Sequence, residues 1–277
     1  MLTQPFRVSA LSRIRTALFV PADDAHRCAR AWSAGADAVI VDLEDAVSGD
    51  AKADARAQLK ARLRGAAARV TAVVRINAVD SEAGRLDIEA LANLPVDAVM
   101  VPKADPPAVR AAARLGRPII ALIETAAGVL AAPRTAGVGG VARIMFGPVD
   151  FAAELGADPA GDFLYARSQI ALVSAAAGLS PPLDGPCMNL ADTEQLLAEA
   201  TRARGLGFGG KACVHPKQIP VVSEAFRPSA EEIDWAIRVK CAYETATRQG
   251  RGVVSVGGQV VDAPVARRAY RILDRQP

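Results

Sequence analysis

Histidine and cysteine are too few and too scattered in this 277-residue chain to build the commonest protein metal sites. The presence of only two histidines excludes a multi-histidine metal centre. The four cysteines match no zinc or redox spacing, so we interpret them as unpaired thiols in a reducing compartment.

Long apolar runs and clustered positive charge are also missing. No apolar run reaches the length of about 18 residues that a membrane-spanning helix needs. Residues 1–15 lack the three regions of a signal peptide, which predicts a cytoplasmic protein. The net charge is only +3 and no basic block alternates with aromatic residues, so neither nucleic acid nor a membrane is an expected partner.

The chain does contain a regular alternation of apolar runs with alanine-rich helical patterns. Strands are predicted at residues 16–20, 38–42, 70–76, 98–102, 119–123, 143–146, 182–184 and 207–214. Helices are predicted between them at residues 24–34, 50–63, 82–91, 107–115, 126–133, 163–177 and 192–203. Eight such units favour an α/β fold, a TIM (β/α)₈ barrel that spans residues 1–227 and carries the catalytic site.

The pattern changes after residue 227. A helix is predicted at residues 231–249, a hairpin at residues 253–261 around a glycine turn, and a last helix from about Pro264. We expect residues 228–277 to form a helical arm that lies outside the barrel and packs on a neighbouring subunit.

Two predicted strands end abruptly in a carboxylate. Residues 120–124 (I-A-L-I-E) end at Glu124, and residues 144–150 (I-M-F-G-P-V-D) lead to Asp150. The carboxyl ends of neighbouring barrel strands meet at one face, where such folds carry out their chemistry. Two oxygen ligands without a nearby histidine or cysteine suit Mg²⁺, which leaves its other positions to water and substrate.

Other charged residues follow the neighbouring strands. The acids Glu44 and Asp45 either start a helix or lie around the metal and its waters. Arg75 either pairs with an acid or binds a substrate carboxylate or carbonyl. Lys103 is either a solvated loop charge or a counter-charge to the acids, and His215 either caps a loop or touches substrate.

The seventh and eighth predicted strands add four further candidates. Asp184, Gly209, Gly210 and Lys211 are expected at the same face, and the two glycines are a weak signal for a phosphate-binding turn.

Seven segments in order along nearly the whole chain suggest a family. They are RTALFVP (residues 15–21), VDLEDAV (41–47), VRIN (74–77), VPK (101–103), IET (123–125), FGPVD (146–150) and GGKACVHPKQ (209–218). Together they resemble the citrate lyase beta-subunit-like branch of the HpcH/HpaI aldolase superfamily. The segment GQVVDAP (258–264) is similar to the family's glycine–aspartate–proline segment near the C-terminus.

The resemblance implies a Mg²⁺-dependent carbon–carbon lyase that acts on acyl-CoA thioesters and is usually a homotrimer. It implies that Glu124 and Asp150 bind the metal, that Arg75, Glu124, Asp150 and the adjoining Pro148 contact substrate, and that Asp262 is an acid/base reaching a neighbouring subunit's site. The expected substrates are citryl-, malyl- or citramalyl-CoA, which give acetyl-CoA and a keto acid. Two alternatives are a metal-dependent aldolase that acts on free keto acids and a citrate lyase subunit that needs an acyl-carrier partner.

Overall fold

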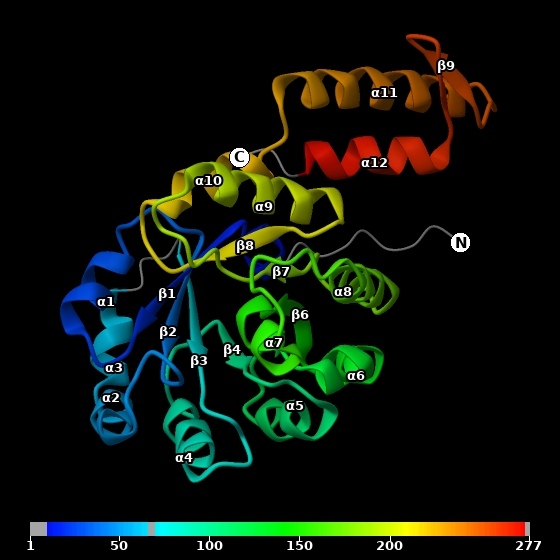
Figure 1. The fold of residues 1–277 in the computed structure, drawn as a ribbon. Helices are drawn as coiled ribbons and strands as arrows, with labels where there is room; N and C mark the ends of the chain where they lie inside the picture. Colours follow the sequence, from blue (N-terminus) through cyan, green and yellow to red (C-terminus); the bar gives the residue numbers. More distant parts are fainter. Residues whose placement is uncertain (1–9, 66–69, 275–277) are drawn as a thin grey trace. The chain divides into compact units, whose positions relative to one another are not determined.

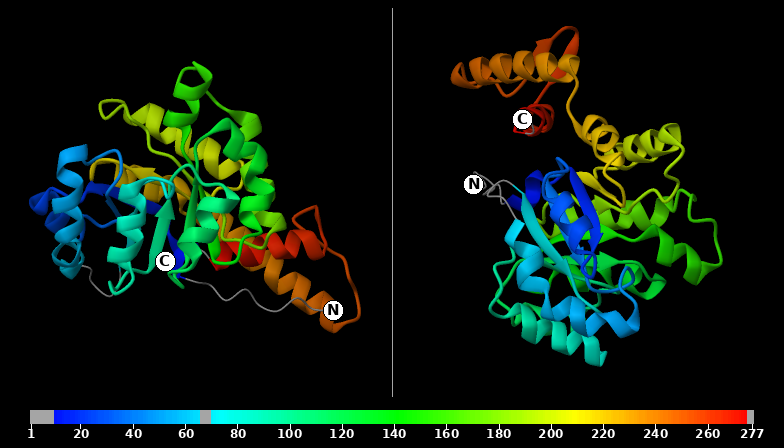
Figure 2. Two further views of the ribbon diagram at one scale, coloured as in Figure 1. Left: turned by 90° about the horizontal axis from the view of Figure 1, so that it is seen from below. Right: turned by 90° about the vertical axis from the view of Figure 1, so that its left-hand side faces the viewer.

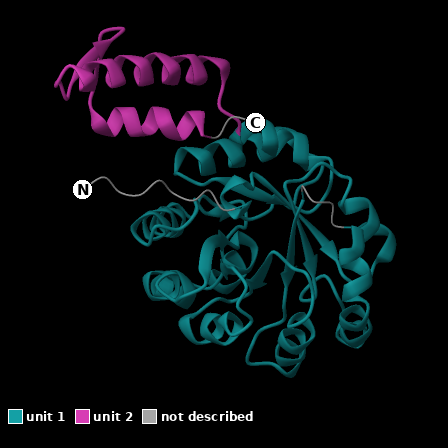
Figure 3. Ribbon diagram, turned by 180° about the vertical axis from the view of Figure 1, so that it is seen from behind, with its two compact units in different colours: residues 1–226 teal, residues 227–277 magenta. Residues whose placement is uncertain are grey.

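The structure is a computed structural model that describes residues 10–65 and 70–274. Its contacts divide the chain into two compact units, Met1–Phe226 and Arg227–Pro277 (Figure 3). Within the described residues, no helix has both the length and the apolar character needed to span a bilayer.

The first unit is a closed barrel of parallel strands in sequential order, in which β8 pairs back with β1 (Figure 1). The strands are β1 (Thr16–Pro21), β2 (Ala38–Asp42), β3 (Thr71–Arg75), β4 (Ala98–Val101), β5 (Ile119–Ile123), β6 (Val141–Phe146), β7 (Leu183–Asp184) and β8 (Gly210–Cys213). The predicted TIM barrel is therefore confirmed.

Helices surround the barrel on its outer side (Figure 2). They are α1 (Ala25–Ala31), α2 (Lys52–Ala57), α3 (Leu59–Arg62), α4 (Glu82–Leu91), α5 (Pro106–Ala113), α6 (Ala126–Ala136), α7 (Pro148–Leu155), α8 (Leu164–Ala176), α9 (Thr193–Gly205) and α10 (Gln218–Phe226), with 3₁₀ turns η1 (Ala10–Arg13), η2 (Gly49–Ala51) and η3 (Leu63–Gly65). Helices α7 and α10 were not predicted. The single helix predicted at residues 50–63 is instead divided into short α and 3₁₀ segments.

The alternation of side chains along each strand decides which residues enter the barrel. Ala38 and Ile40 of β2, Val73 of β3, and Ile120 and Leu122 of β5 belong to the interior cluster. Continued by two residues, the same alternation carries three charged side chains inward at the carboxyl ends of these strands, namely Asp42, Arg75 and Glu124.

Strand β7 is the least connected part of the barrel. Its only register pair with β6 joins Leu183 to Met145. Leu183 belongs to the interior cluster, whereas the next residue, Asp184, points outward and pairs with Arg167 of α8 at 3.1 Å. The two-residue length fits the prolines at positions 181 and 182, which cannot donate backbone hydrogen bonds to a neighbouring strand.

The second unit has its own small apolar core. Helix α11 (Ala230–Arg248) is followed by the antiparallel pair β9 (Val254–Val256) and β10 (Gln259–Val261), and then by α12 (Ala263–Leu273). Ser229 and Glu232 form a reciprocal capping box at the start of α11. Gly257 and Gly258 make the hairpin turn at φ of 58° and 79°, values that glycine adopts without a steric penalty. The predicted helix–hairpin–helix order of this segment is confirmed.

Candidate active site

Glu124 follows β5 and lies almost completely buried, with 2% of its surface exposed. Its Oε1 accepts a hydrogen bond from the backbone N–H of Lys103 at 2.8 Å. Its Oε2 faces Gly147, where an added Cβ would lie 2.9 Å from Oε2 and 2.6 Å from the Glu124 Cβ. Only glycine therefore leaves room for this carboxylate at the end of β6.

Asp150 stands close to Glu124 because α7 begins immediately after that glycine. Gly147 is the residue before the helix, Pro148 is its first residue, and Asp150 lies in its first turn, where a negative charge is favoured. Burial, together with the negative charges of Glu44 and Asp150, raises the pKa of Glu124 to about 8. The two predicted metal ligands are thus close enough for the charge of Asp150 to affect the pKa of Glu124.

Arg75 is the centre of a cluster of ion pairs at the ends of β2 and β3. Its Nε and Nη2 donate to the two oxygens of Asp42 at 2.7 and 2.6 Å. Its Nη1 lies 3.0 Å from Glu44 Oε2 and 3.3 Å from Asp45 Oδ2. Arg75 therefore pairs with acids in this structure, and its predicted contact with substrate stays a prediction.

Lys103 connects this cluster to Glu124. Its Nζ lies 3.0 Å from Glu44 Oε1, so its side chain is a counter-charge to the acids rather than an isolated loop charge. Its backbone has φ of 46°, an unfavourable value for a residue with a Cβ. The left-handed conformation accompanies the hydrogen bond from its N–H to Glu124, so backbone strain is located at the candidate site.

Glu44 and Asp45 do not start a helix. The next helical segment is η2, which begins at Gly49, and Asp50 is the acid in its first turn. Burial raises the pKa of Glu44, partly opposed by Arg75 and Lys103. Glu44 Oε2 is buried and accepts no aligned hydrogen bond, although it lies near Arg75.

The whole cluster holds more acidic than basic side chains. Its acids are Asp42, Glu44, Asp45, Glu124 and Asp150, and its cations are Arg75 and Lys103. Such an excess of carboxylates favours a bound cation. No group of three or more His, Cys, Asp or Glu side chains is arranged for a metal ion in the described part of the chain.

Four of the residues predicted at this face lie elsewhere. Lys211 and Asp184 point outward from β8 and β7, and they pair at 2.8 Å under the outer helices. Lys211 also contacts Glu199 of α9 at 3.0 Å. The prediction placed Lys211 after the eighth strand, but this strand is Gly210–Cys213 and contains it.

The two glycines before this lysine lie at the opposite end of β8. A Cβ on Gly210 would be 2.5 Å from the carbonyl oxygen of Arg15, and one on Gly209 would be 2.7 Å from the Arg143 guanidinium. Their role is close packing, so the phosphate-binding turn is not present there. His215 caps its loop, since its Nδ1 accepts from the Lys217 N–H at 3.1 Å.

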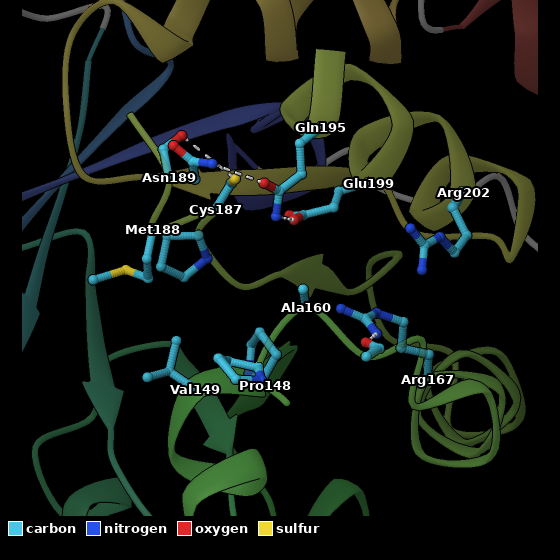
Figure 4. A pocket seen from close by; sticks show the side chains of 13 residues that line it. Pro148, Val149, Ala160, Arg167, Cys187, Met188, Asn189, Gln195, Glu199 and Arg202 are labelled. Atoms are coloured by element: carbon cyan, nitrogen blue, oxygen red, sulfur yellow. Dashed lines mark hydrogen bonds between the residues drawn. The ribbon is translucent and has the colours of Figure 1, made fainter. Parts of the chain in front are cut away.

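A cavity of about 280 Å³ lies between α7, α8, α9 and the loop after β7 (Figure 4). Pro148 and Val149 line one side of it, directly before Asp150. Arg167 and Arg202 line another side, and both are paired with acids, Asp184 and Asp162 respectively. The cavity therefore adjoins the predicted substrate residue Pro148 but presents balanced charge.

Asp262 belongs to the second unit. It precedes α12, and its Oδ1 accepts from the Val265 N–H at 3.1 Å. This cap fixes the position of the carboxylate on its own helix and leaves it half-buried.

Comparisons with known proteins agree with this architecture. Residues 15–216 match the model of the family described as HpcH/HpaI aldolase/citrate lyase. A (3S)-malyl-CoA thioesterase from Cereibacter sphaeroides is 38% identical over 258 residues, which cover 90% of this chain and 89% of that protein. A citrate lyase subunit beta-like protein from Mycobacterium tuberculosis is 39% identical over 266 residues, which cover 93% and 94% of the two chains.

Solved structures are also similar to this chain. CitE from Mycobacterium tuberculosis in complex with magnesium, acetoacetate and coenzyme A has a TM-score of 0.79 at 38% identity, and covers 94% of this chain and 97% of that one. Citrate lyase beta subunit from the same organism, complexed with oxaloacetate and magnesium, has a TM-score of 0.71 at 37% identity, covering 79% of this chain and 100% of that one. On this fold and these similarities, the chain belongs to the HpcH/HpaI aldolase/citrate lyase family.

Proposed function

We propose that this protein is a Mg²⁺-dependent carbon–carbon lyase that cleaves or forms a β-hydroxyacyl-CoA thioester such as citryl-, malyl- or citramalyl-CoA. The products of cleavage are acetyl-CoA and a keto acid. The observation that carries the proposal is the pair Glu124 and Asp150, set beside an arginine in a site with excess negative charge. The magnesium, coenzyme A and keto-acid complexes of CitE support it.

The residues present fit Mg²⁺. Gly147 leaves the space that Glu124 occupies, and the Lys103 N–H binds Oε1, so Oε2 is the oxygen that faces the start of α7. Glu124 and Asp150 would hold the ion, with Glu44 and Asp45 next to its waters. When bound, Mg²⁺ supplies Lewis-acid polarisation of the substrate hydroxyl and carboxylate oxygens.

The remaining steps use side chains of the chain itself. Arg75 binds the thioester oxygen and stabilises the negative charge that develops there as the carbon–carbon bond breaks, an effect of about 3 kcal/mol. Pro148 lines the position of the keto acid. Asp262 of a neighbouring subunit protonates the acetyl-CoA enolate, or removes the corresponding proton in the condensation direction. This role requires an oligomer, which we propose to be a homotrimer.

A second reaction has specific support. The malyl-CoA relative carries the description of a thioesterase, so hydrolysis of the thioester is the alternative on the same site. A citrate lyase assembly with an acyl-carrier partner and an aldolase on free keto acids are further alternatives within the family.

One assay separates these reactions. The purified protein is incubated with Mg²⁺ and each of the three thioesters, and the products are identified by mass spectrometry. A lyase releases acetyl-CoA and a keto acid, a thioesterase releases free CoA and a hydroxy acid, and both lose activity with a chelator. Turnover that survives complete chelation, or no turnover of any thioester, contradicts the proposal.

A further inference from the structure

The carboxylate of Asp42 makes four hydrogen bonds, divided between Arg75 and the loop after β2. Oδ1 accepts from Arg75 Nε at 2.7 Å and from the Glu44 N–H at 2.9 Å. Oδ2 accepts from Arg75 Nη2 at 2.6 Å and from the Ala46 N–H at 3.1 Å. Asp42 is 1% exposed, so water does not compete for these bonds. Both oxygens are therefore fixed by the protein from two directions.

These bonds decide which part of the Arg75 guanidinium remains available. A bidentate pair with a carboxylate fixes the plane of the guanidinium as well as its position. The Phe19 ring lies 5.1 Å from the Arg75 Cζ and packs against that plane. With Nε and Nη2 bound to Asp42, Nη1 is directed toward Glu44 Oε2, at 3.0 Å, and Asp45 Oδ2, at 3.3 Å. The Asp45 side chain is 58% exposed, which makes it the partner most easily replaced by a substrate oxygen.

We propose that Asp42 is a positioning residue for the reaction: it holds Arg75 so that Nη1 meets the thioester oxygen. This inference rests on the proposed function of Arg75. A substrate oxygen replaces Asp45 at Nη1, while the two bonds to Asp42 are kept. Without Asp42, Arg75 keeps its charge, but its guanidinium is no longer held in one orientation. Misplaced hydrogen-bond donors stabilise a transition state poorly.

A double-mutant cycle tests this role. Asp42→Asn keeps the size of the side chain but removes its charge and one of its two acceptor oxygens. Arg75→Lys keeps the positive charge but removes the planar guanidinium. We expect Asp42→Asn to lower kcat about ten- to hundredfold in the wild-type background, with a smaller change in KM, and to lower it less than about threefold in the Arg75→Lys background.

Two further readouts separate positioning from general stability. Mg²⁺ affinity measured by calorimetry is expected to stay within about threefold of wild type in Asp42→Asn, since neither proposed ligand is changed. The matched control is Asp87→Asn, which removes another buried carboxylate paired with an arginine, Arg56, at 2.7 Å. This control is expected to lower the melting temperature but to leave kcat unchanged.

Either of two results overturns the inference. If Asp42→Asn lowers kcat by the same factor in both backgrounds, Asp42 only supports the loop. If Asp42→Asn does not lower kcat in the wild-type background, Asp42 has no role in the reaction. If the wild-type protein cleaves none of the thioesters, the proposed function has failed separately. Acetyl-CoA affinity by calorimetry then replaces kcat in the same cycle, and additive effects on that affinity overturn the inference.

Discussion

The backbone N–H of Lys103 donates to Oε1 of Glu124 at 2.8 Å, and Lys103 has left-handed φ of 46° where it does so. A residue with a Cβ disfavours that conformation, whereas glycine does not. The protein thus accepts backbone strain where one oxygen of the proposed metal ligand is held.

This relationship predicts different results for two variants of Lys103. Lys103→Gly and Lys103→Ala both remove the ammonium and keep the N–H, but only glycine relieves the strain. We expect the glycine variant to be more stable than the alanine variant by about 1 kcal/mol in urea unfolding. Their Mg²⁺ affinities should agree, because the N–H remains. An alanine variant that is the more stable of the two contradicts this account.

The metal assignment predicts that Glu124→Gln and Asp150→Asn each abolish Mg²⁺ binding by calorimetry and Mg²⁺-dependent turnover. Each variant removes a negative charge that would contact the ion. The control is Glu154→Gln on the same helix α7, since Glu154 accepts a hydrogen bond from the Ala126 N–H outside the cluster. Mg²⁺ affinity and rate that persist in both ligand variants exclude the assignment.

The pKa of Glu124, raised to about 8 chiefly by burial, predicts a pH dependence of stability in the metal-free protein. Between its ordinary pKa and 8 the folded state binds a proton that the unfolded state does not, so the free energy of unfolding falls as pH rises. The slope from this group is on the order of 1 kcal/mol per pH unit. Urea unfolding in the presence of EDTA, at pH 5.5 and at pH 7.5, measures this change in the free energy of unfolding.

Two comparisons isolate Glu124 in that experiment. Glu124→Gln should remove this part of the slope, because the amide does not titrate. Excess Mg²⁺ should stabilise the wild-type protein more at pH 7.5 than at pH 5.5, because the ion binds the deprotonated carboxylate. A variant with the full wild-type slope contradicts the assignment of the pH dependence to Glu124.

The proposed role of Arg75 predicts that Arg75→Ala lowers kcat by about a hundredfold or more. The guanidinium would act on charge that develops only as the bond breaks, so kcat should change more than KM. Steady-state kinetics on the thioester that the wild type cleaves best measures both constants. A change confined to KM makes Arg75 a residue that binds substrate without stabilising the transition state.

A shared site predicts that two inactive variants restore each other. Asp262→Ala and Arg75→Ala subunits, unfolded and refolded together, should regain part of the wild-type activity, because some sites then combine an intact Arg75 with a partner's intact Asp262. Each variant refolded alone provides the control. No recovery in mixed oligomers that are shown to form by mass spectrometry argues against the role of Asp262 across subunits.

The sequence analysis selected Glu124 because an apolar run ends abruptly in this carboxylate, and strand periodicity explains its position in the structure. An alternation of inward side chains that begins at Ala38 in β2 reaches Asp42, and the equivalent alternation reaches Glu124 in β5. The same alternation was present in the sequence for Asp42 but was not used, and it could not show the bidentate bond to Arg75. That contact depends on side-chain rotamers across two strands.

Periodicity failed where strand ends were uncertain. The predicted strand at residues 207–214 already contained Lys211, yet this residue was placed after the strand at the active face. In β8 its side chain alternates with the inward Ala212 and therefore faces outward. Asp184 was expected at the active face because it ends the predicted seventh strand, but Leu183 faces inward and Asp184 therefore faces outward. The start of α7 at Pro148 was missed although Gly147 and Pro148 mark it, because the segment FGPVD was interpreted as a strand end leading to Asp150.

The shortness of β7 has a consequence for how this barrel opens. Because β7 has one register pair with β6, few backbone hydrogen bonds join these two strands. Ion pairs connect β7 and β8 to each other and to the surrounding helices instead, and they involve Asp184, Lys211, Arg167 and Glu199. Amide protons of Leu183 and Asp184 should therefore exchange with deuterated solvent before those of β2, and exchange should accelerate when any one of these four ions is neutralised.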